Sequence, residues 1–357
     1  MGKILIYGML DGFGGIEKYI MNFFLYGKNT DKKYGCIIIG QKSPFDMILK
    51  EKNIDVFYTP SKRKLLKNYA ILKKILKENK LKYDSIYINT SGLYYPMVFF
   101  LAKKYKYKIF LHSHLAEVND YRKPLHLLNR HFVNKFILKK FACSQAAAEW
   151  MFEKKYLKEV KIIPNAIDLN KFVYNPLARI EIRSQLHIAD DTLVIGNVAR
   201  LSYVKNQKFA LDVLKELLYS VKAKLILVGD GEDKDELIQY TEKLGISNNV
   251  VFWGYTDEPE RIMNSFDCTI MPSVVEGFPI SLIENQAAGL ECFVSDTITK
   301  EVNVSGHVHF LPLNNRGAWV NEILAFKKER YNCRDLLAEK GYNLEDFESK
   351  MWKVFND

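Results

Sequence analysis

The chain has 357 residues, of which 48% are hydrophobic and 26% are charged, so it is long enough for two domains with sizeable cores. Its longest near-apolar run, residues 93–102, contains a proline and is far too short to span a membrane. The five cysteines are scattered and form no Cys-x-x-Cys pair, which indicates a reducing compartment and argues against a disulfide framework or a zinc site.

The net charge of +10 is unevenly distributed along the chain. Residues 1–165 contain 31 Lys and Arg against 13 Asp and Glu, a net charge of +18, whereas the remaining residues have a net charge of −8. Such a split indicates that the two halves meet different partners. A basic first half is suited to an anionic lipid, a nucleic acid or a phosphorylated substrate.

Strand-like and helical segments alternate along the chain. In the first half, segments of helical periodicity such as 16–26 and 65–76 separate the strand-like runs 3–8, 35–40, 84–90, 108–114 and 139–144. The pattern then restarts, with strand-like runs at 193–199, 223–229, 249–254, 268–273 and 291–296. Near-continuous apolar strands separated by helices predict parallel sheets that are covered on both faces.

Two such series predict an α/β protein with two Rossmann-like, doubly wound parallel-sheet domains that face each other across a cleft. The expected domains are residues 1–165 and 166–342, because the segment 164–176 has two prolines and loses the periodicity. A C-terminal helix at about 343–357 is expected to pack back on the first domain. Ligands of doubly wound sheets bind beyond the carboxyl ends of the strands, so the site is expected in the cleft.

The first strand ends in the glycine-rich stretch "GMLDGFGGIEKYIMNF". Gly12, Gly14 and Gly15 lie between this strand and a helix that has Glu17 in its first turn. Such a turn lets phosphate oxygens approach backbone N–H groups. The dinucleotide spacing G-x-G-x-x-G is not met, and tight turns between a strand and a helix use glycine anyway, so a purely structural role remains an alternative.

The stretch "KIFLHSHLAE" ends another strand with His112 and His114. Residues two apart on a strand share a face, so both imidazoles are expected beyond the strand end. The absence of a third ligand nearby argues against a metal site. A hydrogen-bonding or charge-stabilising role and an ordinary buried histidine are both compatible with the pattern.

The second half opens with "IGNVARLSYVKNQ", in which Arg200 follows a strand and Lys205 precedes a helix that starts near Asn206. Two cations over a helix N-terminus could clamp a diphosphate, with Arg gripping bidentately and Lys acting as a point charge. The alternative is a pair of solvated loop residues.

The stretch "SVVEGFPISLIENQAAG" carries Glu276 in a loop and Glu284 in a helix that is predicted to begin at Pro279 and to end before Gly289. The two glutamates could be an acid/base pair, two ligand-binding groups or ordinary helix charges. The backbone N–H groups of residues 278–282 are expected to be free to take an anion. With the two cations of the preceding motif, this helix start would stabilise a departing nucleotide without a metal.

Together, "GFGGIE", "HSH", "PNAID", "ARLSYVKN", "LVGDG" and "PSVVEGFPISLIENQAAGLECFVSD" resemble glycosyltransferase family 4. The resemblance spans most of the chain, is closest to enzymes that assemble bacterial capsular or exopolysaccharide repeat units, and is most specific at the glutamate pair. It implies the GT-B fold and a metal-independent transfer that retains the anomeric configuration. It also implies a nucleotide-sugar co-substrate, foremost a UDP-sugar, and no further cofactor.

The resemblance also implies the roles of individual residues. Glu284 would bind the ribose hydroxyls, and Glu276 and His114 would contact the donor sugar near the reaction centre. Arg200 and Lys205 would hold the diphosphate. The predicted catalytic set is Glu276, His114, Arg200 and Lys205.

The remaining implied contacts concern the donor. The Gly15 amide would join the diphosphate from the opposite domain, residues 253–255 would border the base, and the amides of residues 278–282 would meet sugar and phosphate oxygens. The predicted donor-binding set is Glu284, Gly14, Gly15, Asn206, Trp253, Gly254, Tyr255, Phe278, Pro279, Ile280, Ser281 and Leu282.

The sequence departs from the family pattern at two places. The family usually has Gly before the clamp arginine, whereas this chain has Ala199, which slightly crowds the phosphate approach. The segment after Glu276 reads "GFPISLIENQAAGL" rather than the commoner "GFGLVLLEAMACG". This second difference is interpreted as a subgroup mark that leaves both glutamates in place.

The basic first half fits an acceptor carried on a polyprenyl diphosphate, so the protein is expected in the cytoplasm, bound peripherally to the inner face of the cell membrane. Within residues 61–82, Leu65, Tyr69, Leu72 and Leu76 form one helical stripe among lysines. The helix could lie on anionic lipid, bury its stripe in the core, or do both.

Three other functions remain open on the sequence alone. The first is a catalytically silent partner subunit, although the intact glutamates and cations speak against it. The second is a nucleotide-sugar epimerase of the same fold. The third, nucleic-acid binding by the basic half, lacks a recognisable module.

Overall fold

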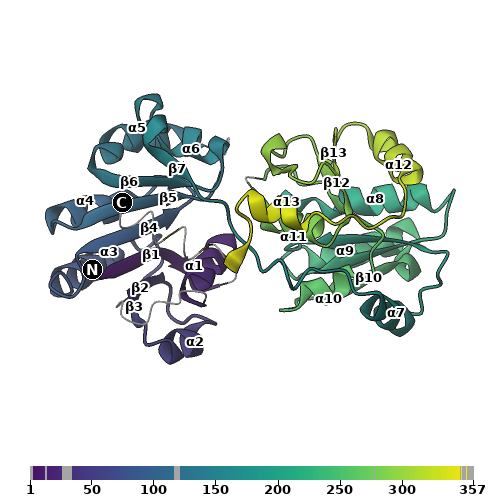
Figure 1. Cartoon of the computed structure of the whole chain (residues 1–357), viewed down its shortest axis with the longest axis horizontal. Coiled ribbons are helices and arrows are strands. Elements are labelled where there is room, and N and C mark those ends of the chain that lie inside the picture. Colours follow the sequence, from purple (N-terminus) through teal and green to yellow (C-terminus); the bar gives the residue numbers. More distant parts are fainter. Residues whose placement is uncertain are drawn as a thin grey trace. The chain divides into compact units, whose positions relative to one another are not determined.

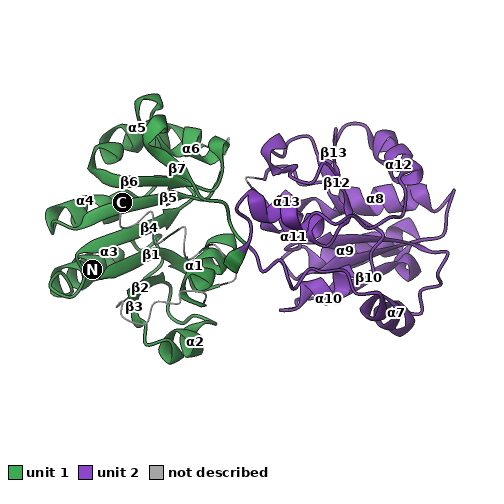
Figure 2. Cartoon of the chain, viewed as in Figure 1, with its two compact units in different colours: residues 1–166, 344–357 green, residues 167–343 purple. Residues whose placement is uncertain are grey.

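The computed structural model describes residues 3–12, 14–25, 34–115, 121–276, 278–345, 347 and 351. The chain forms two compact units (Figure 2). Unit 1 contains residues 1–166 and 344–357, and unit 2 contains residues 167–343. Each unit is built on a parallel sheet with helices packed beside it (Figure 1).

The described residues of unit 1 form a seven-stranded parallel sheet in the order β3-β2-β1-β4-β5-β6-β7. Its strands are β1 (Ile4–Leu10), β2 (Tyr34–Ile39), β3 (Asp55–Thr59), β4 (Ser85–Thr90), β5 (Lys108–Ser113), β6 (Ile137–Ala142) and β7 (Val160–Ile162). Its helices are α1 (Gly15–Leu25), α2 (Asp46–Glu51), α3 (Leu65–Glu78), α4 (Met97–Lys104), α5 (Lys123–Val133) and α6 (Gln145–Met151), with short 3₁₀ helices η1 (Asn134–Phe136) and η2 (Lys154–Glu159).

Both faces of this sheet are buried, as the near-continuous apolar runs predict. In β1, Ile4 and Ile6 pack in a core cluster with Tyr19 of α1. Leu5 and Tyr7, which alternate with them along the strand, pack in a second cluster with side chains of α3 and α4. Since successive side chains of a strand point to opposite faces, an unbroken apolar strand needs a helical layer on each side.

The described residues of unit 2 form a six-stranded parallel sheet in the order β10-β9-β8-β11-β12-β13. Its strands are β8 (Leu193–Val198), β9 (Ala223–Val228), β10 (Val250–Gly254), β11 (Cys268–Met271), β12 (Glu291–Ser295) and β13 (Val308–Leu311). Its helices are α7 (Pro176–Gln185), α8 (Gln207–Leu217), α9 (Lys234–Leu244), α10 (Pro259–Met263), α11 (Ile280–Ala287), α12 (Arg316–Ala325) and α13 (Arg334–Glu339), with 3₁₀ helices η3 (Tyr203–Lys205), η4 (Ser247–Asn249) and η5 (Lys300–Val302).

The sequence patterns did not indicate β3, β7 and β13, which are edge strands of the two sheets. Most residues of β3 are half-buried, and β7 is half-buried to exposed. An edge strand is covered less completely than a central one, so its sequence lacks the continuous apolar run by which the central strands were recognised.

The helix expected at about 343–357 lies mostly outside the described residues, because residues 346, 348–350 and 352–357 are not described. Leu344, Phe347 and Met351 are buried in the core cluster of unit 1 that contains Tyr19. The end of the chain therefore belongs to unit 1, although the preceding segment belongs to unit 2.

The stripe expected on residues 61–82 is divided between core and surface. In α3, Leu72 and Leu76 are buried in the core of unit 1, whereas Leu65 and Tyr69 are exposed. The second half of the stripe therefore packs in the core, as expected for an amphipathic helix that covers its own sheet.

Candidate active site

Both sheets have the strand order in which ligands bind at a topological switch point. In each unit the first strand lies at the centre and the chain builds outward first on one side and then on the other. The switch point lies between β1 and β4 in unit 1 and between β8 and β11 in unit 2. The loops that follow these strands diverge there and leave a crevice at the carboxyl edge of the sheet.

In unit 2, the loops after β8 and β11 are tied together by backbone and side-chain hydrogen bonds. The Val274 amide donates to the Val204 carbonyl at 2.9 Å. Asn206 takes the left-handed conformation, with φ of 54°, and its side-chain Nδ2 donates to the Pro272 carbonyl at 3.1 Å. Asn206 thus ends the loop where α8 begins and fixes that end against the loop of β11.

The same two loops bring Lys205 and Glu276 together. Their side chains form an ion pair between Nζ and Oε2, and they are only 22% and 15% exposed. A partly buried pair of this kind is screened less by solvent than a surface pair. The cation and the carboxylate therefore occupy a defined place at the switch point of unit 2.

Arg200 has a different environment from Lys205. Its Nε donates to Oε2 of Glu232 at 2.9 Å, and the two side chains are 70% and 56% exposed. Such a surface pair contributes little to stability. The expected clamp therefore combines one held cation, Lys205, with one that is free to reorient.

The start of α11 differs in detail from the expectation. The helix begins at Ile280, and Pro279 is its N-cap rather than its first residue. The expectation of five free amides at residues 278–282 was wrong in two places. Proline has no N–H, and the Leu282 amide donates to the Pro279 carbonyl at 3.1 Å. The N-cap side chain accepts no hydrogen bond from this helix, and the first amides of an α-helix have no carbonyl four residues earlier within it.

The body of α11 is fixed in the core. Glu284, like its neighbours Leu282 and Ile283, is buried. Gln286 donates to the Leu282 and Val302 carbonyls and accepts hydrogen bonds from the amides of residues 304 and 305. The buried position of Glu284 is therefore set by a helix that cannot rotate freely.

The end of α11 confirms the expected helix stop. Gly289 has φ of +70°, a backbone conformation that residues other than glycine rarely adopt. A Cβ there would lie 2.2 Å from the Tyr331 carbonyl oxygen. Phe278, just before the helix, is buried and stacks on Tyr342 with ring centroids 6.1 Å apart. Gly277 lies outside the described residues.

Sequence reasoning missed the residues that hold the loop after β8. The side-chain Nε2 of the buried Gln207 donates to the Arg200 carbonyl at 2.9 Å. Gly229 and Gly231 let the loop after β9 approach, because a Cβ at either would lie 2.1 Å from the carbonyl oxygen of Ala199 or Leu201. The spacing "GDG" directly after a strand was the available signal for this close approach.

The expected base-binding segment lies at the carboxyl end of β10. The Gly229 amide donates to the Gly254 carbonyl at 2.9 Å, which places this end beside the loop after β9. Tyr255 is exposed, and its hydroxyl donates to Asp257. Trp253 lines a pocket of about 260 Å³ with side chains of α7 and α10. Its contact with a base remains a prediction.

In unit 1, His112 and His114 lie on one face as expected, with rings stacked 4.2 Å apart. Both are buried, and the expectation that both lie beyond the strand end was wrong for His112, which is inside β5. Nε2 of His114 is 2.9 Å from Oδ1 of Asn89, and Nδ1 of His112 is 2.6 Å from the Tyr87 hydroxyl. Burial lowers the pKa of His114 to about 3, although Asn165 opposes this shift, and burial lowers the pKa of His112 well below its ordinary value. Both rings are therefore neutral at neutral pH, which favours a hydrogen-bonding role over stabilisation by an imidazolium.

The glycine-rich turn after β1 is occupied by a carboxylate of the chain itself. Oε1 of Glu17 accepts a hydrogen bond from the Leu10 amide at 2.8 Å, and a Cβ on Gly14 would lie 2.4 Å from its other oxygen. Burial raises the pKa of Glu17, while the Lys62 charge opposes the shift. Gly14 is thus needed to seat Glu17 at the start of α1, and the contact of the Gly15 amide with phosphate remains a prediction.

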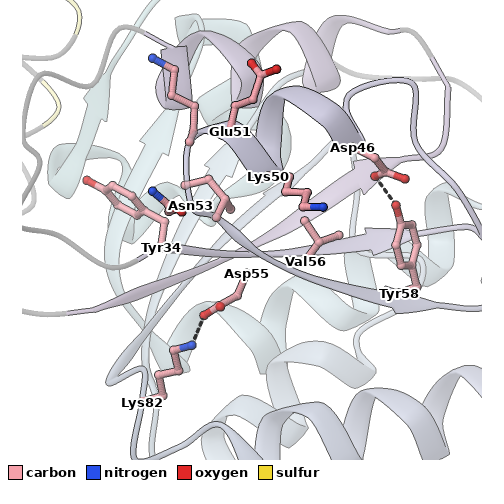
Figure 3. Close-up of a pocket in the computed structure, with 11 residues that line it drawn as sticks. Tyr34, Asp46, Lys50, Glu51, Asn53, Asp55, Val56, Tyr58 and Lys82 are labelled. Carbon is pink, nitrogen blue, oxygen red and sulfur yellow. Dashed lines mark hydrogen bonds and ion pairs between the residues drawn. The ribbon is translucent and has the colours of Figure 1, made fainter.

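A larger hollow of about 930 Å³ lies elsewhere on unit 1 (Figure 3). It is lined by residues of β2, α2 and β3, and Figure 3 shows the Asp55–Lys82 and Asp46–Tyr58 pairs within it. Much of its lining comes from the amino ends of β2 and β3, whereas switch-point ligands bind at carboxyl ends. None of the predicted site residues lines it.

Comparison with known proteins identifies the fold to which this arrangement of two units belongs. The whole chain has the fold of Anabaena HepE, solved in complex with UDP-glucose, with a TM-score of 0.82 and 19% identity over 100% of both chains. The two parallel-sheet α/β units and this likeness confirm the predicted GT-B fold class, whereas the expectation that the two units face each other across a cleft remains a prediction. Residues 178–343, most of unit 2, match the family model "Glycosyl transferases group 1".

Two curated relatives match parts of the chain. EpsF of Bacillus subtilis, named as a glycosyltransferase, is 33% identical over 60% of this chain and 58% of its own length. The UDP-Gal:alpha-D-GlcNAc-diphosphoundecaprenol alpha-1,3-galactosyltransferase of Escherichia coli is 23% identical over 52% of this chain and 51% of its own length. The chain thus spans little more than half the length of these relatives.

Proposed function

We propose that the protein is a metal-independent, retaining glycosyltransferase of family 4 that transfers a sugar from a UDP-sugar to a saccharide on a polyprenyl diphosphate. The product would be a capsular or exopolysaccharide repeat unit. The observation that carries this proposal is the Lys205–Glu276 pair, which joins the loops after β8 and β11 at the switch point of the unit that matches the model "Glycosyl transferases group 1".

Unit 2 holds the donor in this proposal. Glu284, fixed in α11, binds the ribose hydroxyls, and Glu276 meets the sugar hydroxyls. The diphosphate draws Lys205 away from Glu276 and draws Arg200 from the surface, because a doubly charged group competes well for both cations. The uncapped start of α11 adds a favourable dipole. HepE, which shares this fold, was solved with UDP-glucose, which supports a UDP-sugar as donor.

The reaction that we propose needs no covalent enzyme intermediate. The bond from the sugar to the diphosphate breaks as the acceptor hydroxyl approaches the same face of the ring. The departing phosphate oxygen takes the acceptor proton, so neither glutamate acts as the base. Lys205, Arg200 and the α11 dipole stabilise the charge that develops on the leaving group.

Unit 1 binds the acceptor in this proposal. Its switch point presents neutral His114, which can donate or accept a hydrogen bond near the reacting sugar. The name of the Escherichia coli relative contains a diphosphoundecaprenol-linked sugar, which supports a lipid-linked acceptor. No helix of the described residues is long and apolar enough to cross a membrane. We infer a peripheral association of the basic unit 1 with the inner face of the cell membrane.

The test is a binding and turnover panel of UDP-, GDP- and dTDP-sugars with the purified protein. We expect a UDP-sugar to raise the unfolding temperature and to be turned over slowly by water. Glu284→Ala should abolish the donor-induced shift, whereas Glu260→Ala on neighbouring α10 should retain it. Unchanged donor binding in Glu284→Ala would sink the assignment of the ribose site.

The same panel separates the rival functions. A nucleotide-sugar epimerase of this fold would convert UDP-GlcNAc into an isomer without any acceptor. A catalytically silent partner subunit would neither bind nor hydrolyse a nucleotide-sugar. Either outcome would replace the proposed transfer activity.

A further inference from the structure

Helix α5 of unit 1 presents an apolar face to solvent. Leu125, Leu128 and Phe132 are exposed and lie three and four residues apart, so they form one stripe on the helix. Leu128 is 58% exposed and Phe132 is 48% exposed. An ordinary surface helix places such residues toward the core and polar residues outward. In α5, by contrast, this stripe of apolar residues faces solvent.

The inner face of α5 carries two buried polar residues, His126 and Asn129, besides Val133, and it is fixed by hydrogen bonds. Nδ1 of the buried His126 accepts from the Leu93 amide at 2.9 Å, and its Nε2 lies 2.9 Å from the Trp150 carbonyl oxygen. The His126 ring also stacks on Trp150, with centroids 3.9 Å apart. Asn129 donates to the Leu93 carbonyl at 2.7 Å. The helix therefore cannot rotate to bury its leucines without breaking these bonds.

The surroundings of the stripe are strongly basic. Residues 121–139 include Arg122, Lys123, Arg130, Lys135 and Lys139 and no Asp or Glu. His131 of α5 contacts one carboxylate, that of Glu153, whose Oε1 lies 3.0 Å from Nδ1 of His131. Leucine and phenylalanine within a basic surface are the features of a helix that lies in the interface of an anionic bilayer.

We propose that α5 is a membrane-docking helix whose stripe Leu125, Leu128 and Phe132 inserts among anionic lipids. Two further apolar residues extend the surface. Phe100 of α4 contacts Phe136 after α5, with ring centroids 5.9 Å apart, and Nζ of Lys103 lies 3.8 Å from the Phe136 ring centroid. A lysine over an aromatic ring at the rim can turn its charge to lipid phosphates while its stem covers apolar surface.

The position of α5 connects this surface to the proposed acceptor site. Leu93, which pairs with both His126 and Asn129, lies in the loop after β4. At the end of β4, where this loop begins, the Thr90 carbonyl accepts from the His114 amide at 3.2 Å. A helix bound to lipid would thus contact the loop beside His114 directly. In the proposed function, the saccharide on a lipid diphosphate binds near His114. This connection rests on the proposed function.

Helix α3 serves as the internal comparison. Leu66, in its first turn, is 87% exposed, and lysines surround it. However, Leu72 and Leu76, farther along the helix, are buried in the core, so the exposed apolar surface of α3 is confined to its start. We therefore assign docking to α5 rather than to residues 61–82.

The test is sedimentation of the full chain with vesicles of phosphatidylcholine alone or with one-third phosphatidylglycerol. We expect binding to the anionic vesicles only, weakened by salt. The double variant Leu128→Ser and Phe132→Ser should lower the partition coefficient on the order of tenfold or more, because two apolar side chains no longer leave water. Leu66→Ser is the matched control, and it should bind like the unchanged chain.

Several outcomes would overturn the proposal. These are equal binding of the double variant, an equal loss in Leu66→Ser, or a concentration-dependent dimer that the double variant abolishes, which would make the stripe a contact between two copies. The unfolding temperature of each variant checks that it is folded, and Leu128→Ala replaces the double variant if it is not. Vesicle binding requires no donor, so a chain that docks through α5 but transfers no sugar would refute only the proposed function.

Discussion

The two units share a strand order but differ in the ionisable groups at their switch points. Unit 2 carries its cations at the switch point paired with carboxylates, as in Lys205 with Glu276 and Arg200 with Glu232. At the switch point of unit 1 the stacked histidines are buried and neutral, and most of its basic residues lie elsewhere. A common scaffold thus supports an electrostatic site in one half and a hydrogen-bonding site in the other.

The comparison predicts first that the charge of unit 2 dominates catalysis. Lys205→Ala removes a held cation and leaves Glu276 without its partner, so kcat/KM for transfer should fall on the order of 10²-fold or more. Steady-state kinetics with a UDP-sugar measure this loss. Lys208→Ala is the matched control, since Lys208 pairs with Glu236 on the surface. Similar kinetics for both variants would remove Lys205 from the site.

A second prediction concerns the scaffold that holds the charged loops. Gly231→Ala would place a Cβ 2.1 Å from the Leu201 carbonyl oxygen, which belongs to the loop between β8 and α8. Because that neighbour is backbone, the loop must shift, and we expect a loss of about 1–3 kcal/mol in stability together with weaker donor binding. Gly317→Ala, also in unit 2, is a useful control, because the nearest atom to a Cβ there is Oδ1 of Asn315 at 3.6 Å, an ordinary contact. Equal unfolding temperatures would show that the loops are not packed as described.

The fold and the charged motifs could be predicted from sequence because each follows from a local pattern. The central strands were recognisable as buried apolar runs, and Gly289 as a helix stop. The partners of the motifs could not be predicted in this way. That Lys205 meets Glu276 while Arg200 meets Glu232 depends on which loops the strand order places side by side. No spacing within either motif contains that information.

The outward apolar face of α5 is a second feature that local sequence patterns do not predict. Periodicity identifies a helix with leucines on one side, but the usual inference that this side faces the core is wrong here. The orientation is set by His126 and Asn129, whose partner is Leu93, 33 and 36 residues earlier in the chain. Two polar side chains with a distant backbone partner thus outweigh the hydrophobic pattern.

A third prediction uses pH to test the neutral histidines of unit 1. Burial lowers the pKa of His126 to about 4, and it lowers the pKa of His114 to about 3. Their ordinary value is about 6.5, so the unfolded chain binds more protons below that pH. The stability that these groups contribute is present above about pH 6.5 and is lost as the pH falls toward their folded values. We expect the unfolding temperature to fall by several degrees between pH 7 and pH 5.

Hydrogen–deuterium exchange can assign that loss to unit 1. Peptides from β4, β5 and α5 should lose protection as the pH falls, after correction for the intrinsic exchange rate. His126→Gln, which keeps a hydrogen-bonding side chain without a titrating ring, should flatten part of the dependence. Protection that does not change with pH in unit 1 would contradict the burial of neutral rings.

The smallest predicted effect has the opposite sign and lies in unit 2. Glu291 accepts hydrogen bonds from His309 at 2.8 Å and from His307 at 3.1 Å. The bond to Glu291 raises the pKa of His309, and although burial raises the pKa of Glu291, the two histidines hold it below its ordinary value. The stability from His309 is therefore fully present below about pH 6.5 and is lost as the pH rises through its raised folded pKa.

Peptides of β12 and β13 should thus gain slight protection between pH 8 and pH 7, over the range where those of unit 1 stay constant. The effect is small because His309 is partly exposed and solvent screens the pair. His309→Gln should abolish the gain without changing unit 1. If both units respond to pH with the same sign, the contrast between paired charges in unit 2 and buried neutral groups in unit 1 does not hold.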